Sequence, residues 1–155
     1  GDNLYRRSLY TYWRRTIPPP TMANFNAAER EVCVTHKDLT NTPLQALTLM
    51  NNITFVEASR FLAEQMMANG KTTSDRLQHG FRRVLSRTPS PKEAAVLSQA
   101  YVHYKTHYTK DRASATGLLG IGEKPRNKDL DPADHAAWTM VASTILNLDE
   151  TITKE

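Results

Sequence analysis

The chain has 155 residues, a length that suits one domain able to bury a core without metals or disulfides. Its 39% hydrophobic and 23% charged residues are typical of a folded protein rather than a disordered tail, and the single cysteine, Cys33, excludes an intrachain disulfide scaffold. The net charge of +4 comes from 20 basic and 16 acidic residues spread along the chain, so it is only a weak indication of affinity for polyanions.

The N-terminal region combines a predicted helix with a long proline-rich loop. Apolar residues recur at helical spacing between Asp2, near the cap, and Thr16; they are Tyr5, Leu9, Tyr12 and Trp13. Three prolines at 18–20 then remove backbone donors and predict an irregular loop through "IPPPTMANFNAAERE". The next segment, "EVCVTH", has β-branched residues but no pairing partner nearby, so we interpret it as extended coil.

The following stretch, "TNTPLQALTLMNN", predicts the start of a helix. Thr42 lies three residues before Gln45, with Pro43 at the first helical position, which is the spacing of a capping box. The apolar edge of this helix consists of Leu44, Leu47 and Met50. A helix therefore explains most of this string.

Two further helices are predicted next along the chain. Asn51 and Asn52 indicate a break before the first of them, which Asn69 and Gly70 end as a left-handed cap would. Its apolar residues are Phe55, Val56, Phe61, Leu62 and Met66. Ser74 is placed to cap the second helix, whose apolar face consists of Leu77, Phe81, Val84 and Leu85.

The last part of the chain predicts three more helices. Ser90, Pro91 and Glu93 form a capping box for a helix that runs to about Thr109, with a stripe made of Leu97, Tyr101, Tyr104 and Tyr108. The stretch "RASATGLLG" is also predicted to be helical, and "IGEKPRNKDL" to be a polar connection.

The final long helix is predicted to be central in the fold. It opens at Asp131 and Pro132, and its apolar face covers about half the circumference, with Ala137, Trp138, Val141, Ala142, Ile145, Leu146 and Leu148. We find no repeat and no alternating strand pattern. The fold class is therefore all-α, a single irregular bundle of about six helices with a long Pro-rich loop between the first two.

Residue chemistry offers no catalytic signature. Cys33 and His36 could act as a nucleophile and a base, but no family-type sequence surrounds the thiol. We interpret them as a half-buried small thiol near a surface histidine. His103 and His107 are four apart on a predicted helix, the spacing at which two imidazoles can share zinc, with Asp111 on the same line. Because the glutamate of H-E-x-x-H is missing, we interpret both histidines as bordering the tyrosine stripe and expect no metal site.

Arginines and aromatic residues mix near the N-terminus, a composition that can grip phosphates and stack bases. They are Arg6, Arg7, Arg14, Arg15, Tyr5, Tyr10, Tyr12 and Trp13. Most of the aromatics fall on the predicted buried stripe, which leaves the arginines as a solvated face, so we expect no nucleic-acid partner. No glycine-rich phosphate loop is present.

A ligand-binding hypothesis centres on the long loop and the residues that follow it, because a loop of this length is either functional or disordered. The residues concerned are Arg30, Glu31, His36, Thr40 and Asn41. The alternative is that Arg30 and Glu31 only tie the loop to the helices through ion pairs.

Three blocks of the sequence resemble a known family when they are read together: "LYRRSLYTYWRRTIPPPTMANFNAAEREVC", "TNTPLQALTLMNN" and "AAWTMVASTILNLDETITKE". They are similar to the C-terminal domain of unknown function of large exported proteins from planctomycetes and related bacteria, which often carry a cytochrome c domain. The resemblance spans essentially the whole sequence and is specific for membership, not for activity. One departure is Asn52-Ile53, where an Asp-Pro pair is expected; asparagine still caps a helix.

The resemblance implies that residues 1–155 are one helical domain, the C-terminal fragment of a larger protein located in the periplasm, on the cell surface or outside the cell. Any export signal would then lie upstream. We expect no cofactor in this fragment, because Cys33 and His36 supply only one thiol of the C-x-x-C-H haem signature; haem would belong elsewhere in the intact protein. The family has no established catalytic residues to transfer.

We therefore expect a non-catalytic helical structural or interaction module, whose partners are other domains of the same chain. The alternative is part of a polysaccharide-active enzyme or carbohydrate-binding assembly completed by upstream domains. We expect no membrane span, because no stretch approaches the roughly 18 apolar residues that a span needs.

Overall fold

The computed structural model describes residues 1–6, 8–14, 17–28, 33, 35 and 40–153. Within these ranges the regular structure is helical, and the only pairing of extended backbone is an isolated β-bridge between Arg14 and Ile17. The all-α prediction is confirmed, with six helices of seven residues or more. None of the described helices combines the length and the hydropathy that crossing a membrane requires.

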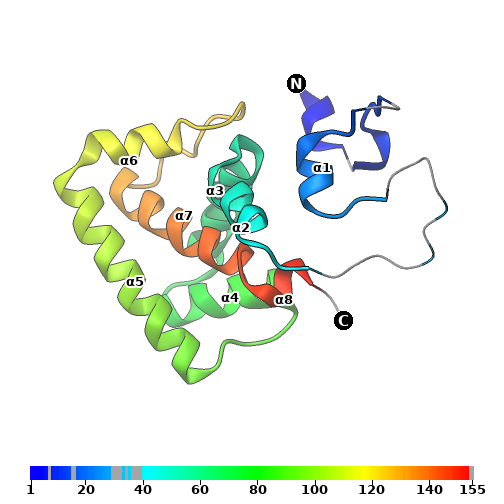
Figure 1. Cartoon of the computed structure of the whole chain (residues 1–155). Helices are drawn as coiled ribbons and strands as arrows, with labels where there is room; N and C mark the ends of the chain where they lie inside the picture. Colours follow the sequence, from blue (N-terminus) through cyan, green and yellow to red (C-terminus); the bar gives the residue numbers. More distant parts are fainter. Residues whose placement is uncertain (7, 15–16, 29–32, 34, 36–39, 154–155) are drawn as a thin grey trace.

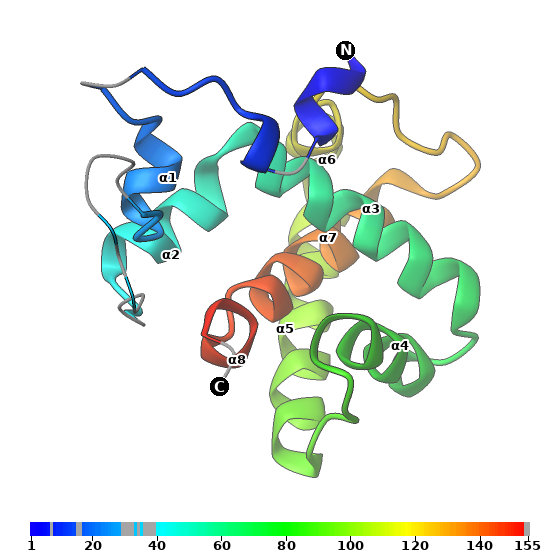
Figure 2. The same cartoon turned by 90° about the vertical axis from the view of Figure 1, so that its right-hand side faces the viewer.

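Helix α7 forms the centre of the bundle, with the other long helices around it (Figure 1). In chain order, the long helices are α2 (Pro43–Asn51), α3 (Ile53–Asn69), α4 (Thr73–Leu85), α5 (Pro91–Lys110), α6 (Arg112–Leu119) and α7 (Pro132–Leu146). Helices α3 and α5 make the most extensive contacts with α7, and Figure 2 shows α7 between them. Helix α6 covers the first half of α7, and α4 packs against α3 and the second half.

The composition of α7 explains its central place. Its fully buried apolar side chains are Ala136, Ala137, Trp138, Val141, Ala142 and Ile145, which confirms the wide apolar face predicted from the sequence. The alanines allow the neighbouring helices to approach closely, while the Trp138 ring stacks on Tyr101 with 4.5 Å between ring centroids. The core around α7 is therefore closely packed on all sides.

Side-chain caps fix most of the helix starts. Thr42 Oγ1 accepts the Gln45 N–H at 3.3 Å, and Gln45 Oε1 accepts the Thr42 N–H at 3.0 Å, so the predicted capping box is present. Ser90 and Glu93 form the second predicted box at the start of α5, and Asp131 caps α7. Each such cap stabilises its helix by about 1 kcal/mol.

Two predicted helix boundaries are wrong in detail. Helix α4 is capped by Thr72 instead of Ser74, because Asp75 reaches back to the Thr72 N–H and completes a capping box. Gly70 ends α3 in an extended conformation, with φ −119°, and not as a left-handed cap. Glycine is needed there for another reason, since a Cβ atom would lie 2.6 Å from the backbone nitrogen of Arg76.

The predicted N-terminal helix over residues 2–16 is wrong. The described part of this segment holds two 3₁₀ turns, η1 (Asp2–Tyr5) and η2 (Ser8–Tyr10). Leu9 is 73% exposed and Tyr12 81% exposed, so the apolar stripe is largely uncovered. A short helix is marginal in water unless tertiary packing buries its apolar face, and here that burial is missing.

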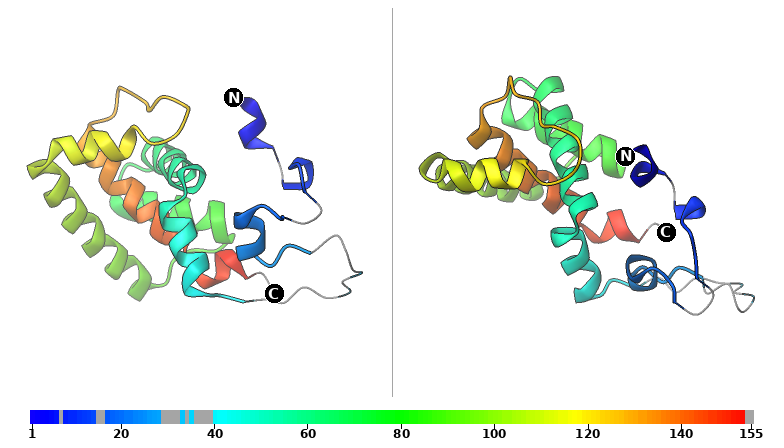
Figure 3. Two further views of the ribbon diagram at one scale, coloured as in Figure 1. Left: turned by 45° about the horizontal axis from the view of Figure 1, so that its top comes forward. Right: turned by 90° about the horizontal axis from the view of Figure 1, so that it is seen from above.

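Two short helices add to the predicted set. Helix α1 (Pro20–Asn24) lies inside the predicted irregular loop and begins with Pro20. Proline suits the first position of a helix, because a backbone N–H there would have no acceptor within the helix. Helix α8 (Asp149–Ile152) follows α7 directly. Helices α1, α2 and α8 lie together at the end of the molecule opposite α6 (Figure 3).

Candidate functional site

A cavity of about 840 Å³, which we call the N-terminal cavity, lies between the N-terminal segment and the helical bundle. Residues of η2 and α1 form one side of it, and residues of α2, α3, α7 and α8 form the other. Large apolar residues in its wall include Trp13, Met22, Phe25, Leu49, Phe55 and Ile152. The volume is within the range of roughly 300–1,000 Å³ that is typical of small-molecule sites.

The wall of this cavity is mostly apolar. None of the described residues that line it carries a charge. Ser59 Oγ donates to the Phe55 carbonyl at 2.8 Å, and Thr151 Oγ1 donates to the Ile145 carbonyl at 2.9 Å, so these hydroxyl hydrogens point into the protein backbone. Phe25 meets Phe55 edge to face, with 6.0 Å between ring centroids. The described wall offers apolar contact and holds no acid–base pair.

Gln45 ties the N-terminal segment to α2 beside the cavity. It is only 2% exposed, and its Nε2 donates to the Asn24 carbonyl at 2.8 Å and to Thr40 Oγ1 at 3.3 Å. Asn24 Nδ2 in turn donates to Thr48 Oγ1 at 3.1 Å, and Asn26 Nδ2 donates to Thr40 Oγ1 at 2.6 Å. Helix α1 is therefore attached to α2 through polar side chains.

A buried ion pair anchors the α6–α7 connection on α3. Arg60 and Glu57 are 1% and 4% exposed, and Arg60 NH2 lies 3.3 Å from Glu57 Oε1. Arg60 also donates to the carbonyls of Leu119 and Lys124, at 3.1 and 2.6 Å. Burial favours a higher pKa for Glu57, but hydrogen bonds from the Lys124 N–H and the Tyr5 hydroxyl lower its pKa below the usual value. The carboxylate is therefore held charged by protein donors.

Exposed apolar side chains gather in the N-terminal third of the chain. Among the described residues, eleven large apolar side chains are exposed, and nine of them lie within residues 5–53. Four of these form what we call the α2 strip: Leu44, Leu47, Met50 and Ile53, which are 53–64% exposed. The apolar edge that the sequence predicts for this helix thus faces outward.

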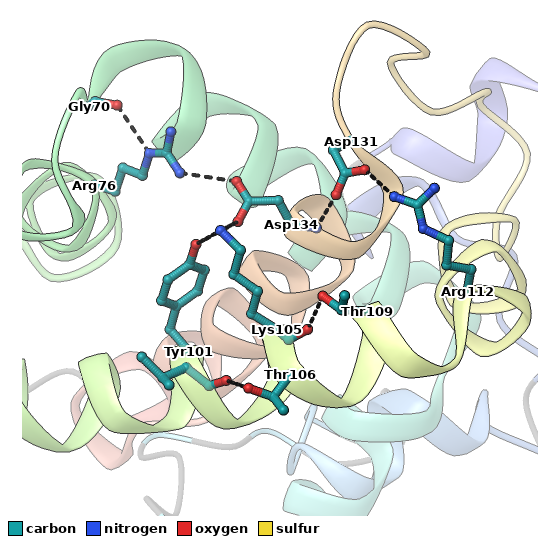
Figure 4. Close-up of polar contacts among 10 residues, drawn as sticks. Gly70, Arg76, Tyr101, Lys105, Thr106, Thr109, Arg112, Asp131 and Asp134 are labelled. Carbon is teal, nitrogen blue, oxygen red and sulfur yellow. Dashed lines mark hydrogen bonds and ion pairs between the residues drawn. The ribbon is translucent and has the colours of Figure 1, made fainter.

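A polar cluster joins α4, α5 and α7 (Figure 4). The Tyr101 hydroxyl donates to Asp134 Oδ1 at 2.5 Å, and Lys105 Nζ lies 3.2 Å from the same oxygen and 3.0 Å from the tyrosine hydroxyl. Arg76 NH1 lies 3.4 Å from Asp134 Oδ2, while Arg76 Nε donates to the Gly70 carbonyl at 3.1 Å. Three helices therefore meet at one carboxylate.

The protonation states of Tyr101 and Asp134 favour a structural role for this cluster. Burial and the hydrogen bond to Asp134 raise the pKa of Tyr101, so the hydroxyl keeps its proton at neutral pH. Burial favours a higher pKa for Asp134, but the hydrogen bonds from Tyr101 and Lys105 and the charges of Lys105 and Arg76 lower its pKa below the usual value. A charged carboxylate with a partner on each oxygen, beside a protonated tyrosine, ties helices together and is poorly suited to proton transfer.

The ligand-binding residues predicted from the sequence fall only partly in the described ranges. Three of them lie outside these ranges: Arg30, Glu31 and His36. Thr40 accepts hydrogen bonds from Asn26 and Gln45, and Asn41 Nδ2 donates to Asp149 Oδ1 at 2.7 Å. Both side chains thus help to hold α1 and α8 near the start of α2, and their role toward a ligand stays a prediction.

The two histidines considered for zinc are exposed on α5. His103 and His107 each meet the edge of the tyrosine that follows, with ring centroids 5.7 and 5.1 Å apart. The described ranges contain no group of three or more His, Cys, Asp or Glu side chains that could hold a metal ion. Cys33 is exposed rather than half-buried as predicted, and its predicted partner His36 lies outside the described ranges.

The N-terminal cavity is a feature that sequence reasoning misses. Met22 and Phe25 fall in the stretch that the sequence predicts to be an irregular loop, where no periodicity places them against a neighbour. The available signal is that two large apolar residues follow the proline run closely. Such residues indicate an ordered, partly packed loop, but they do not identify the helices that complete the wall.

Comparison with known protein families gives one match. A family described as "PSD1: Protein of unknown function (DUF1553)" matches residues 1–101, which is about two thirds of the chain. That range includes the described N-terminal segment, the α2 strip and most of the cavity wall. No curated protein and no solved structure matches the chain significantly.

Proposed function

The chain belongs to the PSD1 family of proteins of unknown function (DUF1553), and on that premise we propose that it is a non-catalytic helical interaction module. Its contact surface is the α2 strip together with the exposed apolar residues of the N-terminal segment. Its partner is another domain of the same, longer polypeptide. The intact protein is an exported cell-envelope protein of a planctomycete or related bacterium, with any haem bound by a separate cytochrome c domain.

The distribution of exposed apolar residues supports this proposal. Nine of the eleven exposed large apolar side chains in the described ranges lie within residues 5–53, and residues 40–56 contain no charged residue at all. A helix that faces water normally carries charges on its outer side. The centres of protein–protein interfaces, by contrast, are depleted of charge and rich in aromatic residues and methionine. The α2 strip shares two of these features, since it is free of charge and includes Met50.

The rest of the described surface differs. Helix α5 exposes Val96 and Val102, but these stand singly among polar and charged residues such as Glu93 and Lys105. Single exposed apolar residues are normal on any protein, whereas a contiguous apolar area marks an interaction site. The two valines therefore serve as an internal control for the α2 strip.

Hydroxyl-radical footprinting tests the proposed contact, because it measures the solvent exposure of side chains directly. We expect oxidation of Leu44, Leu47 and Met50 to fall several-fold in a longer polypeptide that carries this sequence, relative to the isolated chain. Oxidation of Val96 and Val102 should stay unchanged. Equal oxidation of the α2 strip in both forms would contradict the proposal.

A second candidate function is carbohydrate binding, as part of a polysaccharide-active assembly. Exposed tyrosines favour it, since Tyr10 and Tyr12 are 63% and 81% exposed and flat aromatic faces can stack on sugar rings. Calorimetric titration with neutral polysaccharides checks this function. Binding that resists high salt and is lost in the Tyr10→Ala/Tyr12→Ala variant, but not in Val96→Ala, would support it, and an absence of binding heat would count against it.

A further inference from the structure

We infer that the N-terminal cavity binds an uncharged hydrophobic small molecule, one with a hydrocarbon body and no ionised group. This inference concerns the interior of the cavity and does not depend on the docking proposed for the α2 strip.

The large apolar residues of the cavity wall are incompletely buried. Trp13, Phe25, Leu49 and Phe55 all line the cavity, and all are only half-buried although each is large and apolar. In the α7 core, residues of the same kind such as Phe81 are fully buried. The space of about 840 Å³ between these half-buried residues is large enough to hold a drug-sized molecule.

The cavity wall also offers few hydrogen-bond partners to water. A buried water typically needs two to four polar partners. The Ser59 and Thr151 hydroxyl hydrogens are directed to backbone carbonyls, and most of the other lining groups are apolar. Water beside this wall therefore finds few hydrogen-bond partners on it, and its displacement by an apolar molecule is favourable.

The charge of the cavity wall limits the kind of ligand that it can bind. An ionised group that leaves water for an apolar site loses its hydration and needs a compensating partner. No described lining residue carries a charge, so the described wall favours a neutral ligand. Ser8 and Thr21 bring hydroxyl groups to the same wall, which suits one neutral polar group such as an alcohol or an ester.

The same chemistry favours a small molecule over a polypeptide segment. A segment that entered the cavity would bring backbone N–H and C=O groups, each of which must be hydrogen-bonded when it is buried. The wall offers few polar groups that could satisfy them. A hydrocarbon body makes no such demand.

Binding of the neutral dye N-phenyl-1-naphthylamine to the whole chain tests the inference. The dye should brighten on binding and accept excitation energy from Trp13, which lines the cavity, so the transfer should fall in Trp13→Phe. Because Trp138 is buried in the core, it remains as the unchanged reference. We expect 1-dodecanol to displace the dye at least ten-fold more effectively than dodecanoate or dodecylammonium.

Two filling variants and two controls connect the binding to the cavity. Ala58→Phe and Leu49→Trp add volume inside the wall and should each weaken dye binding at least ten-fold, while circular dichroism verifies that the variants stay folded. Ala95→Phe, on the exposed side of α5, should bind the dye as the unmodified chain does. The Leu44→Asp/Leu47→Asp variant alters the α2 strip outside the cavity and should also leave binding unchanged.

Several outcomes would overturn the inference. It fails if the dye does not bind, if charged and neutral twelve-carbon molecules compete equally, or if both filling variants bind normally while folded. It also fails if Leu44→Asp/Leu47→Asp abolishes dye binding, because the dye would then report the α2 strip. Docking through the α2 strip could still hold in the first three cases, so failure of the two proposals can be told apart.

Discussion

The α7-centred bundle and the N-terminal region of residues 1–53 use their apolar residues in opposite ways. In α7, nine residues are buried, and most of them are apolar. In the described part of the N-terminal region, the one buried residue is Gln45, which is polar, while nine large apolar side chains are exposed. The two regions therefore differ in whether their apolar side chains are buried within the chain or exposed to solvent.

The difference in burial means that the two regions are stabilised by different interactions. The bundle gains its stability mainly from buried apolar area, whereas α1 and α2 are joined mainly by side-chain hydrogen bonds around Gln45. Hydrogen bonds of this kind contribute roughly 1 kcal/mol each, much less than a buried aromatic side chain. The N-terminal region is thus the part of the chain most able to gain from contact with another molecule.

The largest difference between the two regions should appear in a matched pair of truncations. Phe81→Ala empties a fully buried site in the bundle and should lower the free energy of unfolding by about 3–5 kcal/mol. Leu47→Ala removes a 58% exposed side chain and should change it by less than about 0.5 kcal/mol. Urea unfolding measures both. Similar losses would show that the α2 strip is buried in solution.

Loss of the buried Glu57–Arg60 ion pair should have the next largest effect on the free energy of unfolding. Arg60→Met leaves the Glu57 carboxylate buried without its charged partner and should destabilise the fold by roughly 3 kcal/mol. The double variant Glu57→Gln/Arg60→Met removes the unpaired charge and should recover part of that loss. If the single and double variants unfold at the same urea concentration, the charge is not the cause of the instability.

A third effect should appear in the pH dependence of the free energy of unfolding of the bundle. His135 is fully buried, and burial lowers its pKa below the ordinary value of 6.5. The unfolded chain then binds the proton more readily, so stability is complete above about pH 6.5 and falls as the pH decreases below it, by at most about 1.4 kcal/mol per pH unit. Unfolding curves from pH 7.5 to 5 should show this slope, and His135→Gln should flatten it. An unchanged slope in the variant would assign the acid sensitivity to other groups.

Removal of a helix cap should affect amide exchange differently in the two regions. Thr42→Ala removes the α2 cap and should weaken that helix by about 1 kcal/mol, which raises amide exchange in α2 roughly five-fold. Exchange in α5 and α7 should stay as it is, because their protection depends on the bundle. A matched Ser90→Ala change at the start of α5 should instead lower the stability of the bundle itself.

The smallest expected effect is at the surface clamp that holds α8. Arg87 NH2 lies 2.7 Å from Glu93 Oε1, and Arg87 Nε lies 2.8 Å from Glu150 Oε2. The hydrogen bond from Arg87 lowers the pKa of Glu93 to about 2, so its contribution is complete above about pH 4.5 and is lost as the pH falls toward 2. Because these side chains are about one third exposed, Glu93→Gln should cost less than about 1 kcal/mol at neutral pH. A larger loss would mean that α8 is held mainly by this clamp.

The parts of the fold that the sequence predicts are those with local signals. The capping boxes at Thr42 and Ser90 involve residues three apart, and the central place of α7 follows from the width of its own apolar face. Each of these signals acts within one helix. These signals can be recognised in the sequence without knowledge of the tertiary contacts.

The parts that the sequence does not predict depend on distant partners. The stripe with Leu9 and Tyr12 has helical periodicity, yet the described segment contains only short 3₁₀ turns, and these two side chains stay 73% and 81% exposed. The N-terminal cavity joins residues as far apart as Trp13 and Ile152, which no local pattern connects. The candidate site therefore emerged only from the three-dimensional arrangement, while Thr40 and Asn41 turned out to lie among the ties of α1 and α8.

Amide hydrogen exchange across the isolated chain distinguishes the stability of the bundle from that of the N-terminal region, because it measures the stability of each helix in one experiment. We predict that α3, α5 and α7 exchange only through global unfolding, while α1 and α2 open at least a hundred times more often. Uniform protection from α1 to α7 would contradict this account, since the N-terminal region would then be as fully packed as the bundle and would have no need of a partner.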